Sequence, residues 1–340
     1  MHALVTGANG HLGYNLCREL LRRGHQVRAS VRSLADRSRT ERLSALGHIE
    51  LVEADVLDRR QLRAALTQID TLFHLAAVYA YVIEPGREDD VMRPSLEGAE
   101  NAMRAAAEAG TGKVVLTSSI VTLPMTKSGA PPSTEEDWIE DLRTPYIRAK
   151  TLAEQRAWAL ARELKVDLVT VLPGAICGPG FVRRTPSTNL VESIMGGSFR
   201  MGIPNLNFPY VDVRDVVNAH IFVAEKPSTG RYAACNDTQP TFSEINSVMR
   251  EIDPSVPLPL MRLPDFMLGA APIFDRLNHR LLGTPRTVSS EFIATIRGKV
   301  WNASNARIKR ELGWKPSISL RDSLRDTMQT LRENRARAAA

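Results

Sequence analysis

A tyrosine and a lysine four residues apart are the most informative pair in this chain. Tyr146 and Lys150 lie in the segment TPYIRAKTLAEQ, and on a helix a four-residue step places two side chains on one face, one turn apart. A positive charge beside a phenol favours the phenolate, so such a pair can exchange a proton near neutral pH. Moving a tyrosine pKa from about 10 to about 7 needs roughly 4 kcal/mol of preferential phenolate stabilisation. A core tyrosine beside a surface lysine that pairs with Glu154 is the alternative, and the spacing alone does not exclude it.

A glycine-rich loop near the start of the chain gives this pair a context. The loop, TGANGHLG at 6–13, lies between an apolar strand expected over 2–6 and an amphipathic helix expected over 12–23, which ends before Gly24. A second strand is expected over 26–31. A glycine loop that follows a strand and opens a helix in this way is typical of a dinucleotide-binding unit.

The three glycines of the loop have separate tasks. Gly7 permits the tight turn, Gly10 lets the backbone approach the pyrophosphate, and Gly13 lets helix and strand pack closely. The N-terminus of the helix then faces the anionic pyrophosphate.

The end of the second strand distinguishes NAD from NADP. An acidic residue there would accept a hydrogen bond from the ribose 2′-hydroxyl and repel a 2′-phosphate. This chain has Arg32 at that place and no carboxylate before Asp36. A charge-assisted hydrogen bond to phosphate contributes about 1.5–3 kcal/mol. We therefore predict NADP(H) rather than NAD(H) as the cofactor; a solvated arginine in a basic stretch is the alternative.

Three further apolar segments indicate a parallel sheet. Strands are expected over 49–58, 71–77 and 113–119, with helical stretches between them, as in a sheet covered on both faces. Asp55 either accepts a hydrogen bond from the adenine amino group or caps a helix. The predicted fold class is α/β: a Rossmann-type doubly wound parallel sheet with a smaller, mostly helical C-terminal substrate domain.

The expected domain boundaries follow from this pattern. We expect an NADP-binding Rossmann domain over 1–174, to which 208–226 returns, and a substrate-binding domain over 175–330. The segment 331–340, which includes RENRARAAA, is expected to be a flexible tail.

The substrate region is expected to be apolar and aromatic. It should lie in the loop-like stretches 124–145 and 178–210, since ligands bind beyond the carboxyl ends of the strands in such sheets. The predicted substrate residues are Tyr79, Tyr81, Phe199 and Met201, with Phe208 and Tyr210 nearby. Ordinary packing is the alternative for these side chains. An amphipathic helix within 263–283, which carries Phe266, Leu268, Phe274 and Leu277, is a pocket lid, a dimer face or a core helix.

Composition narrows the class of protein further. The 340 residues are 43 % hydrophobic and 24 % charged, which is ordinary for a globular protein. Without an 18-residue apolar run, and with a chain that begins on a core strand, we expect no membrane partner, no signal peptide and a cytoplasmic location. The three scattered cysteines suggest a reducing compartment and no metal site. A net charge of +6 without interleaved aromatics argues against nucleic acid, and we expect a monomer or homodimer.

Taken together, the motifs resemble those of the extended short-chain dehydrogenase/reductase superfamily (the NAD-dependent epimerase/dehydratase superfamily), and within it the dihydroflavonol 4-reductase-like branch. The resemblance covers nearly the whole chain and depends on the order and spacing of several motifs. These are TGANGHLG, VRASVRS, ADVLD, RPSLEGAENAM, VVLTSS, YIRAK, LPGAICGPG, YVDVRDVVNAHIFVAEKP with GRY, and RELGWKP.

The resemblance implies a catalytic triad. Ser119, with Ser118 as the alternative, would hydrogen-bond the substrate oxygen, and Tyr146 would act as the general acid/base. Lys150 would hold the nicotinamide ribose and lower the pKa of the tyrosine. His11 replaces a residue that is usually aromatic or aliphatic, and either contacts the pyrophosphate or packs. The predicted cofactor contacts are Gly7, Asn9, Gly10, His11, Leu12, Gly13, Arg32, Asp55, Val56, Ala76, Ala77, Tyr146, Lys150, Pro173, Gly174 and Ile176.

The main hypothesis is an NADP(H)-dependent oxidoreductase that reduces an aldehyde or ketone to an alcohol by hydride transfer, with Tyr146 as the general acid. Leu123 and Pro124 stand where plant reductases place a substrate-reading polar residue, which disfavours a flavonoid substrate.

Three alternatives remain open on the sequence. The first is a nucleotide-sugar epimerase or dehydratase, in which Arg183, Arg184 and Arg231 would bind the diphosphate. The second is a 3β-hydroxysteroid dehydrogenase on the same scaffold. The third is a sensor that binds NADP(H) without catalysis.

Overall fold

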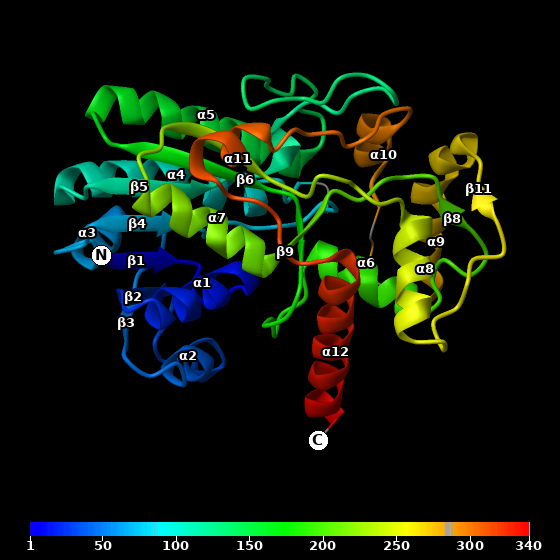
Figure 1. The fold of residues 1–340 in the computed structure, drawn as a ribbon, viewed down its shortest axis with the longest axis horizontal. Coiled ribbons are helices and arrows are strands. Elements are labelled where there is room, and N and C mark those ends of the chain that lie inside the picture. The colour runs from blue at the N-terminus through cyan, green and yellow to red at the C-terminus, as the bar shows by residue number, and fades with distance from the viewer. Residues whose placement is uncertain (85, 283–285, 287, 340) are drawn as a thin grey trace.

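The computed structural model describes residues 1–84, 86–282, 286 and 288–339, and consists of a layered sheet unit and a smaller, mostly helical region (Figure 1). The sheet has seven strands in the order β10-β6-β5-β4-β1-β2-β3, and every neighbouring pair is parallel. The strands are β1 (His2–Thr6), β2 (Gln26–Val31), β3 (Ile49–Glu53), β4 (Thr71–His74), β5 (Lys113–Thr117), β6 (Leu168–Pro173) and β10 (Gly230–Ala234). The strand order reverses beside β1, which confirms the predicted doubly wound fold class.

Helices cover both faces of the sheet because its strands carry apolar side chains on both. Along β1, Ala3 and Val5 belong to one apolar cluster, while Leu4 belongs to the cluster on the opposite face. The helices that bound these clusters are α1 (His11–Arg22) and α7 (Val213–Glu225) on the first face, and α3 (Arg59–Ala65), α4 (Asp89–Ala109) and α5 (Pro145–Leu164) on the second. The alternation of side chains along a strand therefore places one helical layer on each face.

The remaining elements lie around this core and in the C-terminal region. They are α2 (Arg37–Ser44), η1 (Ile120–Thr122), β7 (Ala175–Cys177), α6 (Pro186–Met195), β8 (Ile203–Pro204), β9 (Tyr210–Asp212), α8 (Phe242–Ile252), β11 (Arg262–Leu263), η2 (Asp265–Ala270), α9 (Ala271–Leu282), α10 (Ser290–Ile296), α11 (Ala306–Leu312) and α12 (Leu320–Ala339). Two short parallel pairs, β7 with β9 and β8 with β11, belong to the C-terminal part. The stretch 178–210, expected to be a loop, thus contains α6 and β8.

The first helix and the second strand match the sequence prediction to within one residue, but three strands end earlier than predicted. β3, β4 and β5 stop at Glu53, His74 and Thr117. Apolar and small residues continue past these ends, so the sequence pattern predicts longer strands. The backbone pairing between neighbouring strands stops earlier, where the chain leaves the sheet. The loops that follow carry Asp55 and Ser119 at the carboxyl edge.

Two domain boundaries differ from the prediction. The segment that returns to the sheet extends beyond 226, because β10 pairs with β6 as an edge strand. The expected flexible tail over 331–340 is wrong for 331–339, which continues α12. Leu331 is buried in the C-terminal apolar cluster, and Asn334 Nδ2 donates a hydrogen bond to Phe181 O (2.9 Å). Residue 340 lies outside the described residues.

Two further properties concern the solvent and redox setting. Among the described residues, none of the helices combines the length and the apolarity needed to cross a bilayer. In the same part of the chain, no group of three potential metal ligands comes together. Cys17, Cys177 and Cys235 are all buried and form no disulfide there.

Candidate active site

The structure brings the three predicted triad residues together at the carboxyl end of β5. Proline at the first turn begins α5, and Tyr146 and Lys150 follow on one face of that helix, both buried. Ser119 lies two residues past the end of β5, where its side chain accepts a hydrogen bond from Val121 N (3.3 Å). Lys150 Nζ donates to Thr117 O (3.0 Å), which fixes the ammonium at the strand end.

Burial dominates the electrostatics of Tyr146. It raises the pKa of the phenol well above its usual value, the neighbouring Tyr79 adds to the rise, and a hydrogen bond with Ser119 opposes it. Lys150 is not among the groups that shift this pKa, so its expected effect on the phenol stays a prediction. Tyr146 is accordingly a neutral phenol near neutral pH, which is the form of a proton donor.

Lys150 responds to the same burial in the opposite sense. Burial lowers its pKa to about 8, and the charge of Glu154, one turn further along α5, opposes this fall. Lys150 therefore keeps its ammonium form near neutral pH, and a small rise in pH above that removes the proton.

Aromatic side chains cover the phenol of Tyr146. The rings of Tyr79 and Tyr81, which follow β4, each lie 5.0 Å from the Tyr146 ring, and Phe292 of α10 lies 4.6 Å from Tyr81. Tyr79 Oη is 3.1 Å from Ser187 Oγ of α6. The sequence did not predict a role for Phe292. The amphipathic segment SEFIATI, in which Phe292 lies, is the only sequence feature that indicates a buried position for it. These rings form an apolar wall beside the triad.

Two predicted substrate residues lie elsewhere. Phe199 belongs to a separate apolar cluster, where its ring is 6.1 Å from Phe242. Met201 is 74 % exposed, beside β8. The structure thus brings Tyr79 and Tyr81 to Tyr146, but not Phe199 or Met201. Apolar side-chain type alone does not reveal which of these residues lies at the site.

The glycine loop has the geometry that a dinucleotide requires. Gly7 adopts φ +67°, and Gly10 N donates to Gly7 O (3.0 Å), so the chain turns tightly into α1. A Cβ atom on Gly13 would lie 2.2 Å from Gly7 O and 2.8 Å from Ala8 Cα. Backbone at the N-terminus of α1 therefore lies close to β1, which is the cradle that a pyrophosphate would occupy.

The two glycines make a matched pair for mutation. Gly13→Ala is expected to lower the free energy of unfolding of the cofactor-free protein by about 1–3 kcal/mol, because backbone atoms must move to admit the methyl group. At Gly10 a Cβ would be 3.2 Å from Gly7 O, so Gly10→Ala should change stability by less than about 1 kcal/mol while weakening cofactor binding. Urea denaturation and NADPH titration measure both. Equal losses of stability in the two variants would contradict this account of the loop.

His11 is held by protein atoms. Its Nε2 donates to Pro179 O (3.0 Å), and its ring lies 5.1 Å from that of Phe181. Burial lowers its pKa to about 4, so the ring is neutral. Of the two alternatives for this residue, the structure shows a packed histidine, and any pyrophosphate contact of His11 would come from its backbone N–H.

Arg32 and Asp55 occupy the predicted strand ends. Arg32 follows β2 and is exposed; within the part of the chain that the structure describes, its guanidinium forms no hydrogen bond or ion pair. Asp55 Oδ1 accepts from Leu57 N (2.9 Å) in a local turn, which leaves its other oxygen available to a ligand.

The other predicted cofactor contacts lie along the same edge. Ala76 approaches Gly7, where a Cβ would be 3.0 Å from the Ala76 backbone. Gly174 N donates to Ala234 O (3.1 Å) at the end of β6. Asn9, Leu12, Val56, Ala77, Pro173 and Ile176 lie in the glycine loop or α1, in the segments after β3 and β4, and in β6 and β7.

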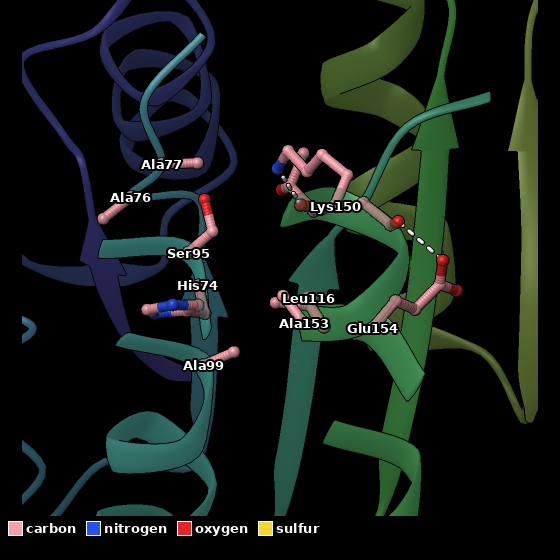
Figure 2. Close-up of a pocket in the computed structure, with 11 residues that line it drawn as sticks. His74, Ala76, Ala77, Ser95, Ala99, Leu116, Lys150, Ala153 and Glu154 are labelled. Atoms are coloured by element: carbon pink, nitrogen blue, oxygen red, sulfur yellow. Dashed lines mark hydrogen bonds between the residues drawn. The ribbon is translucent and has the colours of Figure 1, made fainter. Parts of the chain in front are cut away.

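A small polar cavity lies behind the lysine. It has a volume of about 20 Å³, with His74 and Ser95 on one side and Lys150 and Glu154 on the other (Figure 2). Ser95 Oγ is buried and has no hydrogen-bond partner among the described residues. A polar cavity of this size fits one water molecule.

Glu154 is the centre of a buried network that the sequence did not reveal. Its carboxylate accepts from Ser118 Oγ (2.6 Å), Thr170 Oγ1 (2.7 Å) and Arg231 Nε (2.9 Å), and it is only 1 % exposed. The hydroxyl of Ser118, the alternative catalytic serine, thus donates its hydrogen bond to Glu154. Ser119 is the serine whose hydroxyl lies beside Tyr146.

Arg231 completes this network from the edge strand β10. It stacks on Trp138 (3.6 Å from guanidinium carbon to ring centre) and donates to Thr122 Oγ1 (2.7 Å). It also donates to two carbonyl oxygens, those of Glu135 (2.8 Å) and Asp137 (2.7 Å). Arg231 is 6 % exposed, so the suggestion that it binds a diphosphate is wrong: its donors are occupied by the protein.

The sheet order, the glycine cradle and the Ser-Tyr-Lys geometry fit an extended short-chain dehydrogenase/reductase, and the reductases to which the chain is similar assign it to the dihydroflavonol 4-reductase-like branch. The model of the NAD dependent epimerase/dehydratase family matches residues 3–235. The chain belongs to this family.

Characterised relatives span most of the chain. It is 30 % identical over 270 residues to "Cinnamoyl-CoA reductase CAD2" of Medicago truncatula, covering 75 % of this chain and 82 % of the relative. It is 31 % identical over 339 residues to "Sterol demethylase protein B" of Methylococcus capsulatus, covering 98 % and 99 %.

Solved structures show the same fold over nearly the whole chain. The crystal structure of gox2253 matches with a TM-score of 0.82 at 28 % identity, covering 98 % of both chains. The yeast methylglyoxal/isovaleraldehyde reductase Gre2, complexed with NADPH, matches with a TM-score of 0.77 at 22 % identity, covering 99 % and 100 %. UDP-glucose 4-epimerases complexed with NAD share the fold at 18–20 % identity.

Proposed function

We propose that this protein is an NADP(H)-dependent reductase that converts an apolar aldehyde or ketone into the alcohol. The observation that carries the proposal is the position of a buried, protonated Tyr146 between Ser119 and an aromatic wall, one helical turn from Lys150. The relatives named as reductases support the same reaction class, in which a nicotinamide cofactor takes part.

Each of the three triad residues has a separate role in the proposed reaction. A nicotinamide dinucleotide held by the glycine loop and Lys150 would supply the hydride for the carbonyl carbon. Ser119 and Tyr146 donate hydrogen bonds to the carbonyl oxygen, where negative charge develops, and Tyr146 then transfers its phenolic proton to that oxygen. Lys150, held 3.0 Å from Thr117 O, stabilises the phenolate that remains. A phenol that is protonated before reaction suits reduction.

The aromatic wall supports an apolar substrate. Tyr79, Tyr81 and Phe292 present rings at the triad, and these would pack on a hydrocarbon or aromatic group next to the carbonyl. Because Arg231 is enclosed by protein atoms, a principal cation of the diphosphate alternative is removed.

The unpaired Arg32 supports NADP(H) over NAD(H). Arg32→Ala is expected to weaken NADPH binding about 10- to 100-fold, since a charge-assisted hydrogen bond to the 2′-phosphate contributes about 1.5–3 kcal/mol. Binding of NADH, which lacks that phosphate, should remain nearly unchanged. Fluorescence titration with both cofactors measures the difference, with Arg59→Ala, a half-exposed arginine at the start of α3, as the control. An equal loss for NADH would contradict the assignment.

A panel of aldehydes, ketones and steroids, followed by NADPH absorbance, tests the reaction itself. We expect oxidation of NADPH with apolar carbonyl compounds and formation of the alcohol. Epimerisation of a nucleotide sugar without net consumption of NADPH, together with no turnover of any carbonyl compound, would overturn the proposal.

A further inference from the structure

The large apolar side chains that the structure leaves exposed gather at one end of the molecule. Apart from Leu34, Val78 and Val182, all of them in the described residues belong to this end. They are Met201, Leu258, Leu260, Met261, Met267, Ile273, Phe274, Leu277 and Leu281. The elements that carry or adjoin them, β8, β11 and α9, lie away from the seven-stranded sheet (Figure 1). We call this set the apolar end surface. Contiguous exposed apolar area of this kind marks an interaction site.

Backbone hydrogen bonds join the first part of this surface. Leu260 N donates to Arg200 O (2.8 Å), and Ile203 N donates to Met261 O (3.0 Å). Met201 therefore lies beside the 258–261 segment, although the two are far apart in the sequence. The chain then runs from β11 through η2 directly into α9.

The helix α9 presents its apolar stripe to solvent. Ile273, Leu277 and Leu281 are spaced by four residues, so they lie on one face, and they are 65 %, 48 % and 69 % exposed. The opposite side of the helix packs inward: Pro272 is buried, and the Asp275 side chain, 11 % exposed, pairs with Arg286. A surface helix of a globular protein normally has the reverse orientation. The side chain of Phe266, predicted to belong to this helix, lies outside the described residues.

The charges beside the stripe distinguish between possible occupants. Arg276 and Arg280 are exposed next to it, and Arg262 is exposed on β11. Asp275 is the sole carboxylate of α9 and is turned inward. A second copy docked through the same stripe would bring the arginines of both helices together with no carboxylate of α9 between them. An anionic surface would instead pair with them.

We propose that the apolar end surface binds peripherally to an anionic phospholipid bilayer. Phe274, Leu277 and Leu281 would enter the boundary between headgroups and acyl chains, while Arg276 and Arg280 contact the phosphates. The helix of 12 residues lies in the membrane plane and does not span it. This proposal departs from the sequence prediction of no membrane partner, which rested on the lack of a spanning segment.

This surface is continuous with the wall of the active site. Leu268 of η2 packs in one apolar cluster with Ile293 and Ile296 of α10, and Phe292 of the same helix contacts Tyr81. Binding at the surface would thus place the aromatic wall near the lipid phase, from which an apolar substrate could enter. The proposal goes beyond the proposed function and does not depend on it.

Flotation with vesicles tests the proposal on the full chain. Wild type is expected to float with phosphatidylglycerol/phosphatidylcholine vesicles and much less with pure phosphatidylcholine. Phe274→Ser/Leu277→Ser should reduce the bound fraction at least tenfold, because it removes two apolar side chains that would enter the bilayer. Both side chains are exposed, so their replacement leaves the core intact. Arg276→Gln/Arg280→Gln should remove the preference for phosphatidylglycerol. Val182→Ser, an exposed apolar residue elsewhere, is the control and should bind as wild type.

Two results would overturn this inference. One is a wild type that stays unbound at every phosphatidylglycerol content. The other is a dimer in sedimentation velocity that Phe274→Ser/Leu277→Ser dissociates, with no vesicle binding, which would assign the surface to a second copy. Thermal melting of each variant verifies folding. Vesicle binding is measured without substrate, so its outcome is independent of whether any carbonyl compound is reduced.

Discussion

Replacing Tyr146 with phenylalanine is expected to lower kcat for carbonyl reduction about 100- to 10,000-fold, the usual contribution of a positioned proton donor. The substitution removes only the hydroxyl, and the ring stays packed against Tyr79 and Tyr81. The Kd for NADPH should therefore remain nearly unchanged. Steady-state kinetics and cofactor titration separate the two effects.

Tyr232→Phe is the matched control for that experiment. The Tyr232 hydroxyl donates to Glu311 Oε2 (2.8 Å), and its ring packs in the apolar cluster with α1 and α7 rather than in the cluster of Tyr146, so its loss should leave kcat within about twofold. If Tyr146→Phe retained wild-type kcat while still binding NADPH, the phenol would not be the proton donor, and a non-catalytic sensor would become the better interpretation.

Removing the charge of Glu154 is expected to have the largest effect on stability. Glu154→Gln leaves Arg231 buried without its counter-ion, and breaking a buried ion pair from one side costs about 3–5 kcal/mol. Urea denaturation measures this loss. Glu100→Gln, which interrupts a partly exposed pair with Arg156, is the control and should cost no more than about 1 kcal/mol.

The same substitution should also shift the pH dependence of the reaction. Glu154 opposes the fall in the pKa of Lys150, which burial has already lowered to about 8. Without that carboxylate the pKa of Lys150 falls further, so the ammonium is lost at a lower pH. The alkaline limb of kcat/KM should move toward neutrality.

A double variant separates the structural effect from the electrostatic one. Glu154→Gln/Arg231→Gln removes both charges and should recover much of the lost stability, while the alkaline limb stays shifted because the carboxylate is still missing. A limb that returned to its wild-type position would contradict the electrostatic link between Glu154 and Lys150.

The parts of the fold and site that the sequence predicted correctly depend on local patterns. The strand, glycine loop and helix at the start of the chain depend on residues within one short segment, so α1 and β2 were placed to within one residue. The relation between Tyr146 and Lys150 is also local, since one helix fixes it. Ser119 was assigned from its place in the VVLTSS motif, which the family resemblance matched.

The features that were missed depend on residues distant in the sequence. Glu154 and Arg231 are 77 positions apart, and charged residues in a sequence are normally assigned to the surface. The helical continuation over 331–339 follows from Arg and Ala, which favour helices, and from the burial of Leu331 against α6 and α8. The raised pKa of Tyr146 reflects burial by Tyr79 and Tyr81, which a four-residue spacing cannot reveal.

The ion pair between Glu154 and Arg231 also constrains the order of events during synthesis. A nascent chain that has left the ribosome only as far as β6 contains Glu154 but neither β10 nor its arginine. In that intermediate we expect the carboxylate to stay hydrated or take up a proton, because a buried charge without a partner is costly. We therefore expect a fragment covering 1–174 to be less stable than the same residues in the full chain, which contains the edge strand.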